Sequence, residues 1–170
     1  MKTVGKTFLR IRIFHAEAIK KRHSGVEWAE VFTQFHILTA EIVAQSGGSV
    51  VRLYPDGLLA AFDTVENGAQ TAISIQETFQ EGQKFQHIPL VPLAIGIASG
   101  QVLELPINPH HHDYFGSCVE IAEELGQKAR GYAILMNHPI FPTHDDIRVQ
   151  SKAGSRDNRP PHEYFVEQPI

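Results

Sequence analysis

Alternation of hydrophobic and polar residues near the N-terminus predicts the first strand. The segment FLRIRIF, residues 8–14, places three aliphatic side chains on one face and Arg10 and Arg12 on the other. This pattern follows because successive side chains of a strand point to opposite faces of the sheet. We therefore expect a half-buried strand with one apolar and one arginine-bearing face.

Helical spacing of apolar residues recurs in three segments. Residues 24–45 carry apolar side chains three and four apart, and Ser24 followed by Glu27 matches the capping-box pattern. Residues 64–81 show the same period, and a third helix is expected from Gly116 to about residue 130. These three helices separate the strands along the chain.

The remaining strands are expected in hairpins. The segment SVVRLYPDGLLAAF predicts two strands joined by a turn at Pro55-Asp56-Gly57. Residues 90–105 predict two further strands that meet near Gly100, followed by an irregular loop over 106–112. A short strand over 132–136 and a final hairpin with strands at 147–151 and 163–167 complete the pattern.

This order predicts an α+β fold with a mainly antiparallel sheet, helices packed on one face and a C-terminal hairpin. The chain has 170 residues, of which 42% are hydrophobic, and this suits a single domain over residues 1–170.

Charge and cysteine content exclude several classes of protein. The net charge is −4, and the basic turn Lys20-Lys21-Arg22-His23 is short, so we expect no nucleic-acid partner. No run of about 18 apolar residues is present, so we expect no membrane insertion. The single Cys118 cannot form an intramolecular disulfide, which fits a cytoplasmic location, and a buried apolar role suits it best.

Three blocks of sequence carry a resemblance to a known family. They are VVRLYPDGLLAAF (50–62), LAIGIASGQVL (93–103) and DYFGSCVEIAEEL (113–125). The first is similar to the Asp-Gly hairpin of class III nucleotidyl cyclase homology domains, and the second to their I-G-I-x-x-G strand pair. The third is similar to their D-x-x-G-x-x-V-N-x-A-x-R-L segment. The chain thus resembles adenylate and guanylate cyclases, which implies a ferredoxin-like class III nucleotidyl cyclase fold.

The resemblance implies a site between two subunits that dimerise head to tail. In the family, two aspartates hold two divalent ions that activate the ribose 3′-hydroxyl and neutralise the triphosphate. An Asn orients the ribose and an Arg stabilises the charge that develops on the α-phosphate. In adenylate cyclases, a Lys and an Asp read the base.

The resemblance assigns each of these roles to a position in this chain. The first metal aspartate falls on Arg12, and the second is retained as Asp56. The remaining positions are the ribose-orienting Asn, the transition-state Arg, the base-reading Lys and Asp, and a phosphate-anchoring Lys. They correspond to Glu120, Glu124, Arg52, Asp113 and Lys152, respectively.

Several of these positions carry the wrong charge for the family reaction. Arg12 has no lone pair with which to ligate a metal ion. Glu120 and Glu124 share a helix face, where two carboxylates would repel a triphosphate. The reversed charges complement each other, so we hypothesise that Arg12 faces Asp56 within a subunit and meets Glu120 and Glu124 across a dimer.

Simpler roles remain open for several of these residues. Asp56 in the Pro-Asp-Gly sequence also fits the role of an ordinary turn residue. Asp113 is placed to cap the third helix. Arg52 also suits a solvent-facing strand position. The tract His110-His111-His112 suggests a metal site, because imidazole binds Zn, Ni or Cu, although such tracts in loops are usually solvated.

The sequence therefore predicts a catalytically degenerate class III cyclase-like domain, a pseudoenzyme in intracellular signal transduction. We expect it to form a homodimer, or a heterodimer with a related cyclase domain. No cofactor is expected, with Mg or Mn needed only if residual nucleotide binding exists. The alternatives are a divergent adenylate or guanylate cyclase making a cyclic nucleotide from ATP or GTP, and a nucleotide-binding sensor without turnover.

Overall fold

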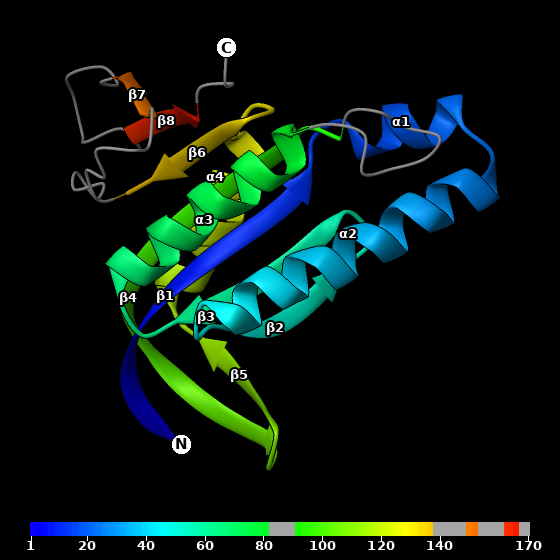
Figure 1. Ribbon diagram of the computed structural model, residues 1–170. Helices are drawn as coiled ribbons and strands as arrows, with labels where there is room; N and C mark the ends of the chain where they lie inside the picture. The colour runs from blue at the N-terminus through cyan, green and yellow to red at the C-terminus, as the bar shows by residue number, and fades with distance from the viewer. Residues whose placement is uncertain (82–90, 138–148, 153–161, 167–170) are drawn as a thin grey trace.

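The described part of the chain forms one eight-stranded sheet with four helices (Figure 1). The computed structural model describes residues 1–81, 91–137, 149–152 and 162–166. The elements are β1 (Lys2–Ile13), α1 (Ala16–Arg22), α2 (Gly25–Gln45), β2 (Ser49–Tyr54), β3 (Gly57–Phe62), α3 (Val65–Gln80), β4 (Leu93–Asn108), β5 (His111–Phe115), α4 (Ser117–Lys128), β6 (Ala133–Met136), β7 (Val149–Lys152) and β8 (His162–Val166).

The sheet has the strand order β2-β3-β1-β4-β6-β8-β7, and β5 pairs with the outer part of β4. The β4–β6 pair is parallel, and the other strand pairs are antiparallel. The prediction of a mainly antiparallel sheet ending in a C-terminal hairpin is therefore confirmed.

Helices cover both faces of this sheet, whereas the sequence led us to expect helices on one face. Leu9, Ile11 and Ile13 of β1 belong to the core under α2 and α3. Phe8 belongs to a second core, shared with Val119 of α4 on the opposite face. The expectation of a half-buried β1 is wrong for this reason, and Arg10 on the α4 side is only 3% exposed.

β4 is one strand of 16 residues rather than two strands meeting at Gly100. Its outer part continues through the segment we expected to be a loop and turns into β5. Together with the start of β1, it forms a projection that we call the arm, defined as residues 2–5, 102–108 and 111–115 (Figure 1).

The helix boundaries follow local capping chemistry. Ser24 accepts a hydrogen bond from the backbone N–H of Glu27, whose carboxylate accepts from the backbone N–H of Ser24, so the predicted capping box is confirmed. The sequence analysis missed α1, where we expected only a basic turn. The three cations in the last turn of α1 stabilise it, because they lie near the partial negative charge at the C-terminus of the helix. No helix in the described part of the chain is both long and apolar enough to span a membrane.

Two glycines bring α4 close to the sheet. A Cβ added to Gly96 of β4 would lie 2.2 Å from the backbone nitrogen of Gly126 in α4. A Cβ added to Gly126 would lie 2.6 Å from Cγ of Arg10. These close approaches place the C-terminal half of α4 directly over the arginine-bearing face of β1.

Candidate functional site

An ion pair with a buried arginine lies on the face of the sheet that α4 covers. Nη2 of Arg10 donates to Oδ1 of Asp56 at 2.7 Å, and Nη1 donates to the carbonyl of Ile11 at 2.8 Å. The Arg10 guanidinium carbon also lies 4.1 Å from the centre of the Tyr54 ring, within the range of a cation–π contact. The Arg10 side chain is 4% exposed and that of Asp56 is 30% exposed, so the arginine is the more deeply buried partner.

The ion pair continues into a second charged cluster through Tyr54. The Tyr54 hydroxyl donates to Oε1 of Glu123 on α4, and Arg52 lies 3.3 Å from the same oxygen. Arg52 also donates to Oδ1 of Asp113 at 3.0 Å. Asp56, Arg10, Tyr54, Glu123, Arg52 and Asp113 therefore form one continuous network, which we call the internal polar network.

The environment of this network shifts the pKa of two of its members. Burial and the hydrogen bond to Glu123 raise the pKa of the Tyr54 hydroxyl above its usual value of 10.0. Burial disfavours the Arg52 cation, but the hydrogen bonds to Asp113 and Tyr54 outweigh it and raise the pKa of this guanidinium. The network therefore favours a neutral tyrosine and a charged arginine.

Arg12 lies on the same side of the sheet as Arg10, but its side chain bonds to the C-terminus of α4. It donates to the carbonyl oxygens of Gly126 at 2.6 Å, Gln127 at 2.9 Å and Ala129 at 3.4 Å. Carbonyls at a helix C-terminus lack partners within the helix and carry a partial negative charge, so a guanidinium caps them well. Burial lowers the pKa of Arg12, and the nearby Asp56 partly offsets this effect.

The hypothesis that Arg12 faces Asp56 within the subunit is therefore wrong. The partner of Asp56 is Arg10, two residues earlier on the same face. The resemblance had placed the first metal aspartate at Arg12; a residue that shares a metal ion with Asp56 must lie beside it, and that position belongs to Arg10.

The donor groups around Asp56 do not fit a two-metal site. The only carboxylate in this ion pair is already bound by a guanidinium, which cannot ligate a metal ion. In the described part of the chain, no group of three or more His, Cys, Asp or Glu side chains is placed to hold a metal ion.

The outer surface of α4 carries the two acids that the resemblance aligned with Asn and Arg. Glu120 and Glu124 are both exposed, and Glu124 pairs with Lys128 on the same helix at 2.6 Å. Their contact with Arg12 across a dimer stays a prediction, although the described donors of Arg12 already bond to α4 of its own chain.

The structure assigns other partners to the remaining candidates. Asp113 does not cap α4, since the N-cap residue is Gly116; it pairs with Arg52, which is thus not simply solvent-facing. Lys152 lies on β7 opposite Glu163 of β8, away from the network in the strand order. Cys118 is buried, as expected, and burial raises the pKa of its thiol.

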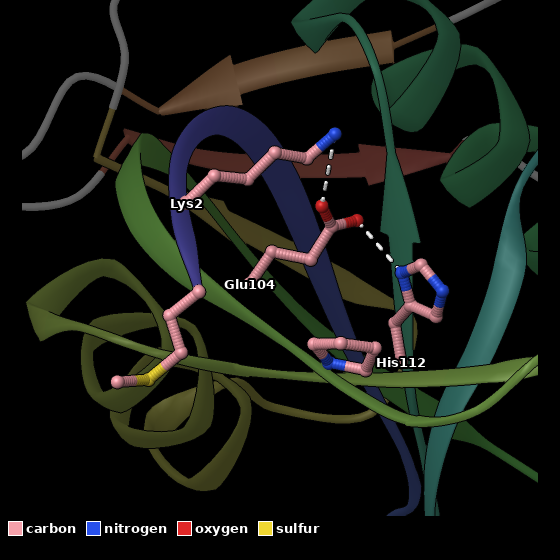
Figure 2. Close-up of a pocket in the computed structure, with 5 residues that line it drawn as sticks. Lys2, Glu104 and His112 are labelled. Carbon is pink, nitrogen blue, oxygen red and sulfur yellow. Dashed lines mark hydrogen bonds and ion pairs between the residues drawn. The ribbon is translucent and has the colours of Figure 1, made fainter.

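Two residues of the histidine tract, His111 and His112, lie on β5 of the arm, and His110 lies in the turn that precedes β5. His112 Nδ1 lies 2.8 Å from Oε1 of Glu104, whose other oxygen pairs with Lys2 at 3.4 Å (Figure 2). These three residues line an open recess of about 330 Å³ together with Met1 and Pro106. The hydrogen bond from His112 lowers the pKa of Glu104.

Sequence reasoning missed three members of the internal polar network: Arg10, Tyr54 and Glu123. Arg10 alternates with aliphatic residues, and this pattern marks a solvent-facing side chain when the second face of a strand is exposed. The available signal was a second arginine on the same face as Arg12, opposite a hairpin that carries an aspartate.

Comparison with solved structures places this arrangement among known folds. The chain superimposes on the guanylyl cyclase domain of the RhoGC fusion protein from the aquatic fungus Blastocladiella emersonii with a TM-score of 0.78, 16% identity and 98% coverage of both chains. For the guanylate cyclase domain of RhGC from Catenaria anguillulae, solved in complex with GTP, the TM-score is 0.74 with 16% identity and 98% coverage of both chains.

A bacterial light-regulated adenylyl cyclase gives a TM-score of 0.75 with 16% identity, covering 98% of this chain and 91% of that one. No protein-family profile matches the sequence, and no curated protein sequence does. At this level of identity the likeness shows the fold alone. The chain therefore has the α+β fold of class III guanylyl and adenylyl cyclase catalytic domains.

Proposed function

We propose that this chain is a non-catalytic cyclase-like domain that acts in signalling by binding a second domain of the same fold. The observation that carries the proposal is the buried Arg10–Asp56 pair, which places a fixed cation beside the carboxylate that the family uses for metal binding. A divalent ion at Asp56 would have to displace this guanidinium from a site where it has three partners.

The groups expected to read a base are also engaged within the chain. Arg52 bonds to Asp113 and to the carbonyl of Tyr114, and it lies beside Glu123. A nucleotide base would have to replace these internal hydrogen bonds, and the loss of a charge-assisted bond costs about 1.5–3 kcal/mol. The internal polar network therefore disfavours nucleotide binding.

The surface of α4 disfavours a triphosphate as well. Glu120 and Glu124 are exposed on one helix face, and each would repel a nearby phosphate by about 4 kcal/mol for unit charges 4 Å apart at an effective dielectric of 20. An Asn and an Arg at these positions would instead donate hydrogen bonds to the ligand.

A protein partner is supported by apolar residues on the arm. Leu103 of β4 and Phe115 of β5 lie directly opposite each other, so they share one face of the arm. They are 45% and 51% exposed, and nearby Ile107 is 56% exposed. Clustered exposed apolar side chains of this kind mark interaction surfaces.

The proposal is tested by measuring nucleotide binding and association on one sample. The wild-type protein is titrated calorimetrically with non-hydrolysable ATP and GTP analogues, with and without Mn²⁺, and its mass is measured by sedimentation. We expect no metal-dependent binding and a concentration-dependent dimer. Micromolar, metal-dependent binding would instead point to a sensor or a divergent cyclase, which an assay for cyclic nucleotide would separate.

Paired surface variants test the arm as the dimer contact. Phe115→Ser removes an exposed aromatic ring from the arm, and Val26→Ser removes an exposed side chain, 80% accessible, from the start of α2. We expect Phe115→Ser to weaken the dimer at least tenfold, because a central interface aromatic typically contributes about 2 kcal/mol, and Val26→Ser to leave it unchanged. Equal dimer affinity in both variants would exclude the arm, and a monomeric wild type would leave a heterologous partner to be sought.

A further inference from the structure

His36 on α2 contacts two backbone carbonyls at once. Its Nδ1 lies 2.8 Å from the carbonyl oxygen of Phe32, one turn earlier in the helix. Its Nε2 lies 2.9 Å from the carbonyl oxygen of Gly57, at the start of β3. Both distances are those of ordinary hydrogen bonds. The imidazole therefore bridges α2 and the β2–β3 turn.

Both contacts can be hydrogen bonds in only one protonation state of the ring. A carbonyl oxygen accepts hydrogen bonds but cannot donate one, so each ring nitrogen must carry a proton to bond to it. A neutral imidazole has one N–H and can satisfy only one of the two carbonyls. The imidazolium form has two N–H groups and satisfies both.

We propose that His36 is a proton-operated clamp that fixes the β2–β3 turn to α2 when it is protonated and releases one contact when it is neutral. Histidine changes its charge between about pH 5 and pH 8 in most environments, so the clamp responds within the physiological range. The clamped residue, Gly57, directly follows Asp56. The clamp therefore connects pH to the geometry of the internal polar network, and it does not depend on the proposed function.

Aromatic and uncharged residues lie beside His36 on its own helix. On α2, the rings of Phe32 and Phe35 lie 4.2 Å and 5.0 Å from the imidazole, and the residues three and four positions away carry no charge. β3 has no ionisable side chain, and α3 meets this part of α2 through the Phe35–Phe79 contact.

The charged groups of β1 and of the β2–β3 hairpin have partners on the α4 side of the sheet. Asp56 pairs with Arg10, and Arg52 and Tyr54 of β2 are held by Glu123 of α4. Arg12 of β1 is bonded to the C-terminus of α4. None of these residues has a hydrogen bond to His36 among the contacts of the described chain.

The ring protonation is read directly by NMR of ¹⁵N-labelled wild-type protein. We expect both nitrogens of His36 to carry protons at about pH 6, and one of them to lose its proton as the pH rises toward 8. The backbone amide of Gly57 is expected to shift with the same midpoint. A ring with one bare nitrogen at both pH values would overturn the proposal.

Stability measurements give an independent readout. Only the imidazolium can donate to both carbonyls, so the second hydrogen bond of the clamp is present at low pH and is lost as the pH rises. We expect the folding equilibrium constant of the wild type, divided by that of His36→Gln, to fall about tenfold between pH 5.5 and pH 8. The control is His23→Gln, which removes a surface histidine 3.2 Å from Glu27. We expect the corresponding ratio of folding equilibrium constants to change by less than about threefold over the same pH range. A pH-independent ratio for His36→Gln would contradict the clamp.

Discussion

Substitution of Asp56 and substitution of Arg10 are expected to reduce the stability of the fold to different extents. Asp56→Asn keeps the shape of the side chain and one acceptor oxygen but removes the negative charge beside a guanidinium that is 4% exposed. Arg10→Met removes the cation but keeps an unbranched side chain for packing against Gly126. We expect the aspartate substitution to be the more damaging of the two, because it leaves a buried cation without its counter-ion.

The magnitude follows from the burial of each charge. Two unit charges about 4 Å apart attract by about 4 kcal/mol at an effective dielectric of 20, and loss of one partner from a buried pair costs about 3–5 kcal/mol. Asp56→Asn keeps one hydrogen bond and the site is partly open to water at Asp56, so we expect a loss of about 2–3 kcal/mol. After Arg10→Met the carboxylate, 30% exposed, can be hydrated, and we expect a loss of about 1–2 kcal/mol.

Urea unfolding followed by circular dichroism and by the fluorescence of Trp28 measures all four members of the cycle at pH 7. The double variant should lie close to Arg10→Met, because the second change then removes no partner. The coupling free energy should thus exceed about 1 kcal/mol. Additive losses, or a smaller loss for Asp56→Asn than for Arg10→Met, would refute the assignment of Arg10 as a buried, Asp56-dependent cation.

Three further predictions concern packing, acid stability and thiol reactivity. Gly96→Ala forces a side chain against the backbone of α4 and should destabilise the fold by more than about 2 kcal/mol in urea unfolding, whereas Gly25→Ala has open space and should change stability by less than about 0.5 kcal/mol. Equal effects would refute the close approach. The lowered pKa of Glu104, caused first by its hydrogen bond with His112, stabilises the fold above the carboxyl's unfolded pKa, and this contribution is lost as the pH falls. His112→Ala should therefore move acid unfolding to higher pH, and an unchanged midpoint would count against the bond. Cys118 should react with a disulfide reagent at least tenfold more slowly in native protein than in urea, since burial raises its pKa and restricts access; equal rates would show an open thiol.

The sequence was informative where local rules act. The structure confirms three features that depend on neighbours in the chain. They are the capping residues of α2, the Asp-Gly turn between β2 and β3, and the shared face of the aliphatic residues of β1, although the burial of its other face was not predicted. The pattern of apolar residues supplied the order of the elements and hence the α+β class, and the resemblance supplied the cyclase fold. α1 escaped prediction because seven residues are too few for a clear helical period.

The partners in the site depend on contacts distant in sequence, and these were predicted less well. Whether an arginine on a strand is buried depends on what covers that face, and α4 reaches it only because two glycines permit a close approach. The alternation alone could not distinguish Arg10, bonded to a hairpin 46 residues away, from Arg12, bonded to a helix end 114 residues away.

The position of Arg10 under α4 constrains the routes by which this chain can change its chemistry. A single substitution that placed a carboxylate at position 10 would put two acids side by side in a site where the arginine is 4% exposed. Before any metal ion could compensate, that intermediate would lose the cation that neutralises Asp56 and stacks on Tyr54. Replacing Arg10 alone therefore lowers the stability of the fold without creating a complete metal site. Further substitutions that add ligands would have to accompany it before metal binding could compensate for the loss.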